Sequence, residues 1–149
     1  YRGKNSETKS FNKSIANYPF VLMMNDIIFA SLTFTPMSQV KQFNEYRSKM
    51  NEKILASDSL IIKRIFNLDT NAYAEGALDV KSKELIGLTC SLVLRCDDCV
   101  KYHLEKCKEI GFTTAEVNEA MGVATLVGGT IVIPHLRRAY EYWEELQNV

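Results

Sequence analysis

The chain has little proline, little histidine and no excess of charge of either sign. Its 149 residues include three prolines, two histidines, and 18 basic residues against 18 acidic ones, so the formal net charge is zero. Proteins that bind nucleic acid irrespective of sequence need many lysines and arginines to neutralise phosphates. The charge balance therefore argues against that function, and we expect no nucleic-acid partner.

Cysteine is too sparse for a small secreted scaffold held together by disulfides. Such scaffolds are shorter and richer in cysteine than a chain with four cysteines in 149 residues. Hydrophobic residues make up 46% of the chain and charged residues 24%, a composition outside the range of disordered proteins and sufficient for a buried core. We therefore expect one globular domain, located in the cytoplasm.

No stretch is apolar over the roughly 20 residues that a membrane-spanning helix requires. The most apolar run, residues 18–34, contains Asp26 at its centre, which costs roughly 2.5–3.5 kcal/mol on insertion scales. This run belongs to a leader, residues 1–36, with four basic against two acidic residues, so the domain that follows, residues 37–149, is mildly acidic. The leader is a targeting segment, an extra ordered element, or sequence upstream of a start at Met37, and it leaves organelle targeting or export open.

The domain lacks the alternation of apolar and polar residues that marks a half-buried strand, and its apolar residues recur every three or four positions instead. Gly111 is placed to end one helix, and a capping box from Thr113 to Glu116 starts the next. Pro134 suits the first turn of the last helix. The class is therefore all-α, with about six helices. We expect these helices at residues 40–57, 60–68, 79–94, 96–110, 113–127 and 134–146.

Polarity along these helices predicts how they pack. The third helix is nearly apolar all round past Glu84, so we expect it to be central and buried, with Cys90 as a packing residue. A polar run, residues 67–71, is expected to end the second helix. One face of the first helix should meet the core. That face consists of Val40, Phe43, Tyr46, Arg47, Met50 and Ile54.

The most informative stretch is Cys96-Asp-Asp-Cys99-Val-Lys-Tyr-His103. On a helix, offsets of three and four residues place Cys96, Cys99 and His103 on one face. Two thiols one turn apart can form a disulfide, and an imidazole one turn beyond Cys99 can remove its proton or return it. Unpaired N–H groups at the start of a helix also stabilise a thiolate. The spacing therefore indicates a redox site.

Other interpretations of these residues remain open. The string C-x2-C-x3-H-x3-C, which ends at Cys107, cannot hold one zinc ion, because eleven residues of helix rise about 16 Å whereas zinc ligands lie about 2.0–2.3 Å from the ion. A three-ligand site completed by Glu84 is still conceivable. Cysteines and lone helical histidines are also often plain packing residues. Glu84 itself either stabilises the start of its helix or orients His103 in a proton relay.

A family resemblance bears on this choice. Glu84, Cys96, Cys99 and His103 fall position by position on the pattern Glu-x11-Cys-x2-Cys-x3-His. With the runs at 77–88, 111–120 and 126–129, this pattern resembles the alkylhydroperoxidase D-like (AhpD-like) branch of the carboxymuconolactone decarboxylase superfamily. The resemblance covers roughly residues 43–146.

The resemblance implies an AhpD-like helical bundle that assembles as trimers or hexamers and reduces hydroperoxides with its thiols. It implies that Cys99 is the attacking thiolate, Cys96 the resolving thiol, and Glu84 and His103 the proton relay. Attack would leave a sulfenic acid on Cys99, which Cys96 would condense into a disulfide. An external dithiol, such as a lipoylated or thioredoxin-like protein, would reduce that disulfide. No metal or other cofactor is expected.

The chain departs from the family pattern directly before Cys99. Some members have a second histidine there, where this chain has Asp98, preceded by Asp97. Two carboxylates in the first turn favour the helix through its dipole but disfavour a neighbouring thiolate by like-charge repulsion. We therefore expect modest peroxidase turnover.

Two other functions remain as alternatives. The first is a carboxymuconolactone decarboxylase-like lyase acting on a cyclic acid such as a lactone, a reaction that needs no paired thiols. The second is a helical oligomer without enzymatic activity, whose CxxC pair senses redox state. Outside the motif we expect Cys107 to be a packing residue and His135 to have no role in the site. Tyr102 flanks His103 and could line a pocket, but we expect it in the core or an interface.

Overall fold

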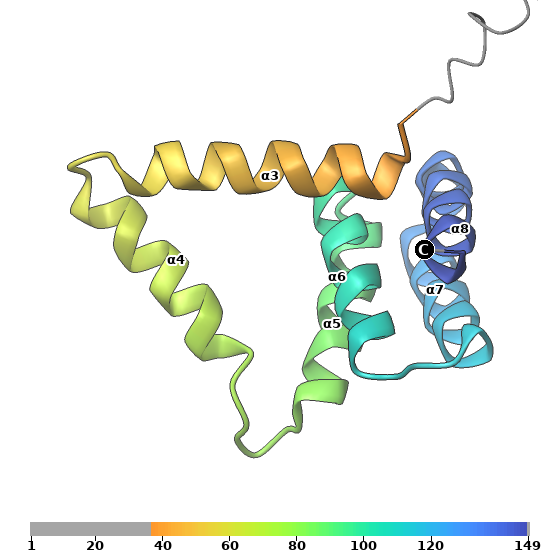
Figure 1. Ribbon diagram of the computed structural model, residues 1–149. Helices are drawn as coiled ribbons and strands as arrows, with labels where there is room; N and C mark the ends of the chain where they lie inside the picture. Colours follow the sequence, from red (N-terminus) through yellow and green to blue (C-terminus); the bar gives the residue numbers. More distant parts are fainter. Residues whose placement is uncertain (1–36, 149) are drawn as a thin grey trace, which may run out of the picture. The chain divides into compact units, whose positions relative to one another are not determined.

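The computed structural model describes residues 37–148, which form six α-helices and one short 3-10 helix, with no strand in this part of the chain (Figure 1). The all-α class and the six helices are thus confirmed. The hypotheses about the leader concern residues 1–36 and lie outside the described residues. The elements are α3 (Gln39–Leu55), α4 (Leu60–Ala72), α5 (Val80–Val93), α6 (Asp97–Glu109), α7 (Thr114–Gly128), η1 (Thr130–Val132) and α8 (Ile133–Gln147).

Local signals in the sequence account for where several helices begin. The capping box is present at α7: Thr113 N–H donates to the Glu116 carboxylate at 2.7 Å, and Glu116 N–H donates to Thr113 Oγ1 at 3.3 Å. The hydrogen bonds that the N–H and the hydroxyl of Thr113 donate to the Glu116 carboxylate hold the pKa of that carboxyl below its usual value. Gly111 takes a left-handed φ of 81° after α6, and Pro134 lies in the first turn of α8.

The second helix is longer than predicted. Residues 67–71 do not end α4, which continues to Ala72. Asn71 donates a side-chain hydrogen bond to Asn67 one turn earlier at 2.9 Å, and the Thr70 hydroxyl donates to the Phe66 carbonyl at 3.1 Å. The polar side chains therefore bond along the helix instead of competing with it.

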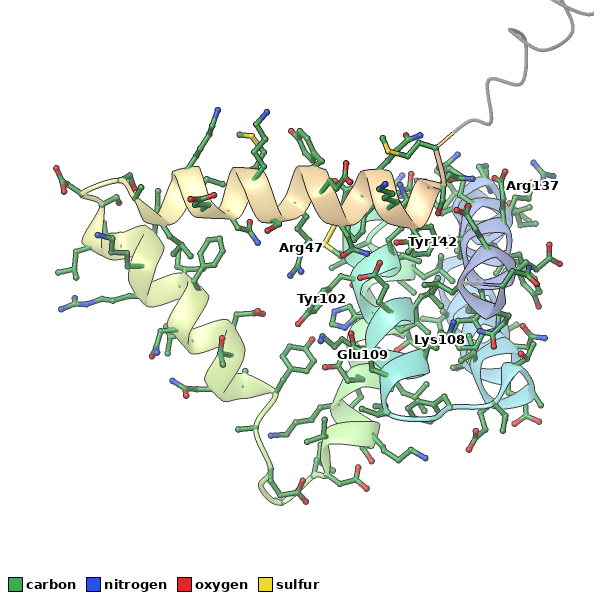
Figure 2. The ribbon with its side chains drawn as sticks, viewed as in Figure 1. Arg47, Tyr102, Lys108, Glu109, Arg137 and Tyr142 are labelled. Atoms are coloured by element: carbon green, nitrogen blue, oxygen red, sulfur yellow. A yellow bond between two sulfur atoms is a disulfide. The ribbon has the colours of Figure 1, made fainter. Side chains whose placement is uncertain are left out.

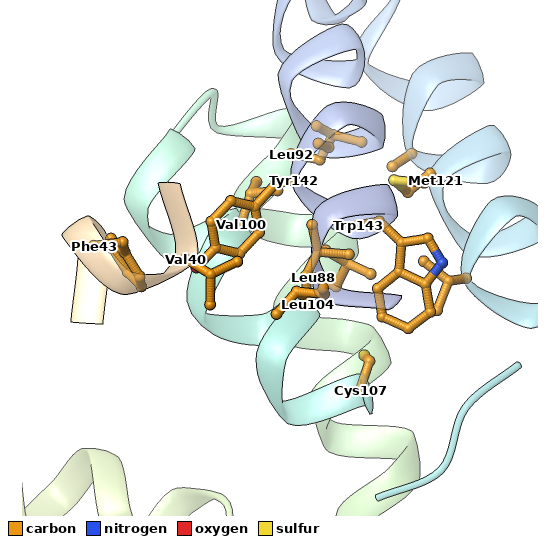
Figure 3. Close-up of a cluster of buried hydrophobic side chains, with 14 of the residues drawn as sticks. Val40, Phe43, Leu88, Leu92, Val100, Leu104, Cys107, Met121, Tyr142 and Trp143 are labelled. Carbon is orange, nitrogen blue, oxygen red and sulfur yellow. The ribbon is translucent and has the colours of Figure 1, made fainter. Parts of the chain in front are cut away.

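The core lies among α5, α6, α7 and α8, with α5 packed against both α6 and α7, and α8 against α6 (Figures 1 and 3). Tyr142 and Trp143 of α8 are almost fully buried, and each polar atom has a partner: Tyr142 Oη donates to Glu105, and Trp143 Nε1 donates to Thr114 Oγ1 at 3.1 Å. The predicted packing role of Cys107 is confirmed. Fully buried around these rings are Leu88, Leu92, Leu104, Cys107, Val117 and Met121.

The predicted inner face of α3 is buried over only part of its length. Val40 and Phe43 are buried, and the Phe43 ring meets the Tyr142 ring edge-on with 6.0 Å between centroids. Beyond them α3 extends away from α8 towards α4, and Tyr46 and Ile54 are exposed (Figure 1). Periodicity correctly found the apolar face, but no part of the core reaches its second half.

The central helix α5 is buried on one side only. Leu88 and Leu92 are inaccessible, whereas Ile86 and Cys90 are exposed, because α6 and α7 leave one side of α5 uncovered. The predicted central position of α5 is confirmed, but its burial is one-sided, and the prediction that Cys90 is a packing residue is wrong for the described chain. No helix between residues 37 and 148 combines the length and apolarity needed to cross a membrane.

Candidate active site

The two motif cysteines lie at the start of α6 and form a disulfide. A very short connection leads to them from α5. In it Arg95 takes a left-handed φ of 61°, which residues with a side chain rarely adopt, and Cys96 N–H donates to the Ser91 carbonyl at 3.0 Å. The Cα atoms of Cys96 and Cys99 are 5.3 Å apart. The turn thus delivers both sulfur atoms to the N-terminal end of a helix, where backbone N–H groups lack helical partners.

Glu84 and His103 meet in the interior between α5 and α6. His103 Nδ1 lies 2.7 Å from Glu84 Oε2, and only 7% of His103 and 3% of Glu84 are exposed. A buried carboxylate accepts hydrogen bonds and has none to give, so Nδ1 carries the donated proton. In the neutral imidazole this leaves Nε2 unprotonated and able to accept a proton. The contact between Glu84 and His103 is the one that the sequence motif suggested.

Tyr73 and Gly87, which the sequence analysis did not single out, complete the surroundings of His103. Tyr73 Oη lies 3.4 Å from His103 Nε2. Gly87 gives both groups room, because a Cβ atom at that position would lie 2.6 Å from Tyr73 Oη and 2.7 Å from His103 Nε2. A glycine inside an otherwise apolar helix is a signal of close approach that could have pointed to this spot.

The imidazole is also flanked by two aromatic rings. The Tyr73 and Tyr102 ring centroids lie 5.4 and 5.1 Å from that of His103. Burial, together with the nearby Glu84 charge, raises the pKa of the Tyr73 hydroxyl. Tyr73 is therefore protonated at neutral pH and available as a donor.

A pocket of about 420 Å³ opens beside Cys99 and His103. The half-buried ring of Tyr102 packs against the core cluster on one part and also lines this pocket, so both roles considered for it are present. The guanidinium of Arg47 lies over that ring, 4.1 Å from its centroid, and the two side chains approach each other from α3 and α6 (Figure 2). Most of the remaining wall is apolar and comes from α3, from the buried Phe43 onward into the half that the core leaves uncovered. It includes Phe43, Tyr46, Met50 and Ile54.

The two aspartates of the motif have different surroundings. Asp97 lies 2.8 Å from His135 Nδ1 and accepts a hydrogen bond from Arg138 Nε at 2.8 Å. His135, for which no role was expected, thus joins α8 to the first residue of α6. These contacts offset the charge of Asp97, whereas Asp98 faces the pocket. Of the two carboxylates expected to disfavour a thiolate at Cys99, Asp98 therefore remains without such partners among residues 37–148.

The three-ligand metal site considered from the sequence is not formed in the described chain. Between residues 37 and 148 no three side chains among histidine, cysteine, aspartate and glutamate are grouped so as to hold an ion. Both motif sulfurs are engaged with each other, and Glu84 is bonded to His103.

Cys107 should be unreactive in the folded protein. Burial raises the pKa of its thiol to about 12, so at pH 8 it is an uncharged and inaccessible thiol. We expect iodoacetamide at pH 8 to leave Cys107 unmodified in native protein, as measured by peptide mass spectrometry, and to modify it after unfolding in urea. Rapid labelling without unfolding would contradict this assignment.

Two glycines in helix interiors should respond oppositely to alanine. Gly122→Ala meets no atom within 4 Å and should raise the free energy of unfolding by about 0.5–1 kcal/mol. Gly87→Ala forces His103 or Tyr73 to move and should lower it by about 1–3 kcal/mol. Urea unfolding followed by circular dichroism measures both. Equal stabilisation by the two substitutions would show that Gly87 is not needed to accommodate the imidazole.

Comparisons with known proteins agree with this geometry. Two crystal structures of one Thermotoga maritima protein are 54% and 52% identical to the chain, with TM-scores of 0.71 and 0.69. They cover 72% of this chain and 95% and 91% of theirs, and the second is described as a carboxymuconolactone decarboxylase family protein with a suggested part in the antioxidative response. A Legionella pneumophila protein of the same family is 28% identical, with a TM-score of 0.54, and covers 70% of this chain and 87% of its own.

One curated relative and one family model complete the comparison. An uncharacterised protein of the Paracoccus denitrificans cox locus is 28% identical over 74 residues, which is 50% of this chain and 67% of the relative. The model of the carboxymuconolactone decarboxylase family, which includes the alkylhydroperoxidase D-like branch, matches residues 61–142. The chain belongs to the carboxymuconolactone decarboxylase family.

Proposed function

We propose that this protein is a thiol-dependent hydroperoxide reductase. The observation that carries the proposal is the juxtaposition of three features: a disulfide-bonded cysteine pair at a helix start, a buried carboxylate–imidazole pair, and a pocket that Cys99 and His103 both line. The antioxidative role suggested for the Thermotoga maritima relative supports the same chemistry. We expect the protein to act in the cytoplasm, where thiol reductants are supplied.

The reaction begins with both thiols reduced. The Cys99 thiolate attacks the terminal oxygen of the hydroperoxide, the O–O bond breaks, and the leaving alkoxide takes a proton to become an alcohol. Cys99 is thereby oxidised to a sulfenic acid. The Cys96 thiol displaces its hydroxyl group as water, giving the disulfide. An external dithiol, provided by a lipoylated or thioredoxin-like protein, then returns both cysteines to the thiol form by exchange.

Glu84 and His103 serve as the proton relay for these steps. His103 Nε2 takes the thiol proton of Cys99 and returns it to the leaving alkoxide. The imidazolium formed between those steps is buried, so it needs a counter-charge. Glu84, 2.7 Å from Nδ1, provides that charge and fixes the orientation of the ring.

The disulfide also weighs against the alternatives. A lyase acting on a cyclic acid has no use for two thiols one turn apart. A redox sensor without enzymatic activity would need the thiols but not the pocket, nor a buried base beside it. Disulfide exchange without peroxide reduction uses the same residues and is separated by the assay below.

The proposal predicts that peroxide consumption depends on Cys99 and Glu84. With tert-butyl hydroperoxide and dithiothreitol, Cys99→Ser should remove activity because the nucleophile is lost. Glu84→Gln should lower kcat/KM by about 100-fold or more, the range typical of general acid–base groups. Glu119→Gln, an exposed carboxylate on α7, is the matched control and should leave the rate unchanged.

The possible results separate the candidate functions. Equal activity in the wild type, Cys99→Ser and Glu84→Gln would refute the peroxidase. Reduction of a small disulfide without any consumption of peroxide would replace the peroxidase by a disulfide oxidoreductase.

We further propose that the chain assembles as a trimer or hexamer, as the family resemblance implies. The support lies in α4, which has no buried residue although one side of it is apolar. Its uncovered side chains include Leu60, Ile61, Ile65 and Leu68, each more than half exposed. A soluble chain rarely leaves such a group of side chains in water unless another surface covers it.

Light scattering after size-exclusion chromatography measures this assembly directly. The wild type should have three or six times the mass of one chain. Ile61→Asp combined with Ile65→Asp should lower the mass, because two charges would enter the apolar contact. Lys63→Ala on the same helix is the control. A monomeric wild type at micromolar concentration would rule the assembly out.

A further inference from the structure

The second nitrogen of His103 has a partner that the proposed mechanism does not use. Glu84 engages Nδ1, which leaves one lone pair on Nε2. The Tyr73 hydroxyl, at the C-terminal end of α4, lies 3.4 Å from that nitrogen. Since Tyr73 keeps its proton at neutral pH, the polarity of the contact is fixed: the hydroxyl donates and Nε2 accepts.

The space occupied by the Tyr73 hydroxyl depends on the absence of a side chain at Gly87. Gly87 on α5 lies against both groups, and any larger residue there would overlap the hydroxyl or the imidazole. The Tyr102 ring also packs against the imidazole, with 5.1 Å between centroids and 64° between the ring planes. The imidazole is thus held at Nδ1, at Nε2 and by the Tyr102 ring, through side chains from three helices or their ends.

We propose that Tyr73 is a positioning residue of the relay: its hydroxyl donates to His103 Nε2, keeps the imidazole uncharged while the site waits for substrate, and holds the accepting nitrogen in place. This inference rests on the proposed function, in which Nε2 takes the proton of the Cys99 thiol. The hydroxyl acts through His103 and does not itself react with the peroxide.

The contact distinguishes the two states of the imidazole. Nε2 accepts the hydroxyl proton of Tyr73 only while the ring is uncharged. Once Nε2 has taken the proton of the Cys99 thiol it is a donor, and the hydroxyl proton must turn away by rotation about its C–O bond. The donated hydrogen bond therefore stabilises the uncharged imidazole, and the positive charge of the protonated ring is balanced by Glu84.

Several other groups bear on the protonation of this imidazole, and the test must keep them unchanged. Glu84 reaches it from α5 and Tyr73 from the end of α4. The other charged or titratable side chains around the same pocket are Arg47 of α3, Asp69 of α4, and Asp98, Cys99 and Tyr102 of α6. None of these is altered by removing the hydroxyl of Tyr73.

The test compares Tyr73→Phe with the wild type in a reaction that needs no peroxide. Reduced protein is alkylated with iodoacetamide between pH 5 and 9, and the labelling of Cys99 is followed by peptide mass spectrometry. Loss of the donor favours protonated imidazole, so the pH at which the rate falls to half on the acidic side should rise by about 0.4–1 unit. At pH 6 the rate should fall about 2- to 10-fold, as expected for one net hydrogen bond. Tyr140→Phe, an exposed tyrosine on α8, is the control and should match the wild type.

A second readout observes the imidazole itself. In nitrogen-15 spectra of the ring, Tyr73→Phe should move the Nε2 signal of His103 towards that of a nitrogen without a hydrogen bond and leave the Nδ1 signal in place. Tyr73→Met, which also lacks a donor, should do the same if the phenylalanine variant folds poorly. Unchanged Nε2 signals and an unchanged acidic limb would overturn the inference.

The two readouts separate this inference from the proposed function. If the wild type consumes no peroxide but Tyr73→Phe shifts both the acidic limb and the Nε2 signal, the peroxidase fails and the role of Tyr73 in holding the imidazole stands. If peroxide is consumed and Tyr73→Phe matches the wild type in both measurements, the peroxidase stands and the role of Tyr73 is refuted.

Discussion

The hydrogen bond between Glu84 and His103 is the constraint on which the rest of the site depends. Both side chains are buried, so neither could remain there without the other, because an unpaired charge or imidazole in the interior is costly. Their pairing requires α5 and α6 to lie side by side at one rotation about their axes. It also requires the absence of a side chain at Gly87, where the imidazole comes closest to α5. The position of the motif cysteines at the start of α6 follows from the same arrangement.

Much of this site could be predicted from the sequence because its parts are local. Cys96, Cys99 and His103 share one helix, so their spacing alone places them on one face, and the family pattern added Glu84. The contact between Glu84 and His103 is confirmed, whereas their proposed roles and those of the cysteines remain predictions. Tyr73 and His135 were missed, because each reaches the site from a helix far away in the sequence. The periodicity of apolar residues within one helix carries no information about such a contact with a distant residue. Only the isolated Gly87 carried a local sign of it.

The errors in the fold have one common physical cause. Periodicity identifies which side of a helix is apolar, but it does not tell what covers that side. On α3 the predicted face continues past the core and becomes a wall of the pocket. On α5 the side that bears Cys90 is uncovered in the described chain, although the sequence predicts that Cys90 is a packing residue. Capping signals performed better, since the hydrogen bonds between Thr113 and Glu116 depend only on residues three positions apart.

The short connection with the left-handed turn at Arg95 explains why the spacing of the motif matters. Because the connection between α5 and α6 is so short, the number of residues from Glu84 to Cys96 determines how far along α5 and at which rotation about its axis Glu84 lies relative to the start of α6. Each residue added to or removed from α5 would turn Glu84 by about 100° around the helix axis and carry its carboxylate away from His103. Substitutions within the interval preserve this spacing, whereas insertions and deletions destroy it. Apart from Gly87 and the buried Leu88 and Leu92, the eleven intervening positions can therefore vary in identity while their number stays fixed.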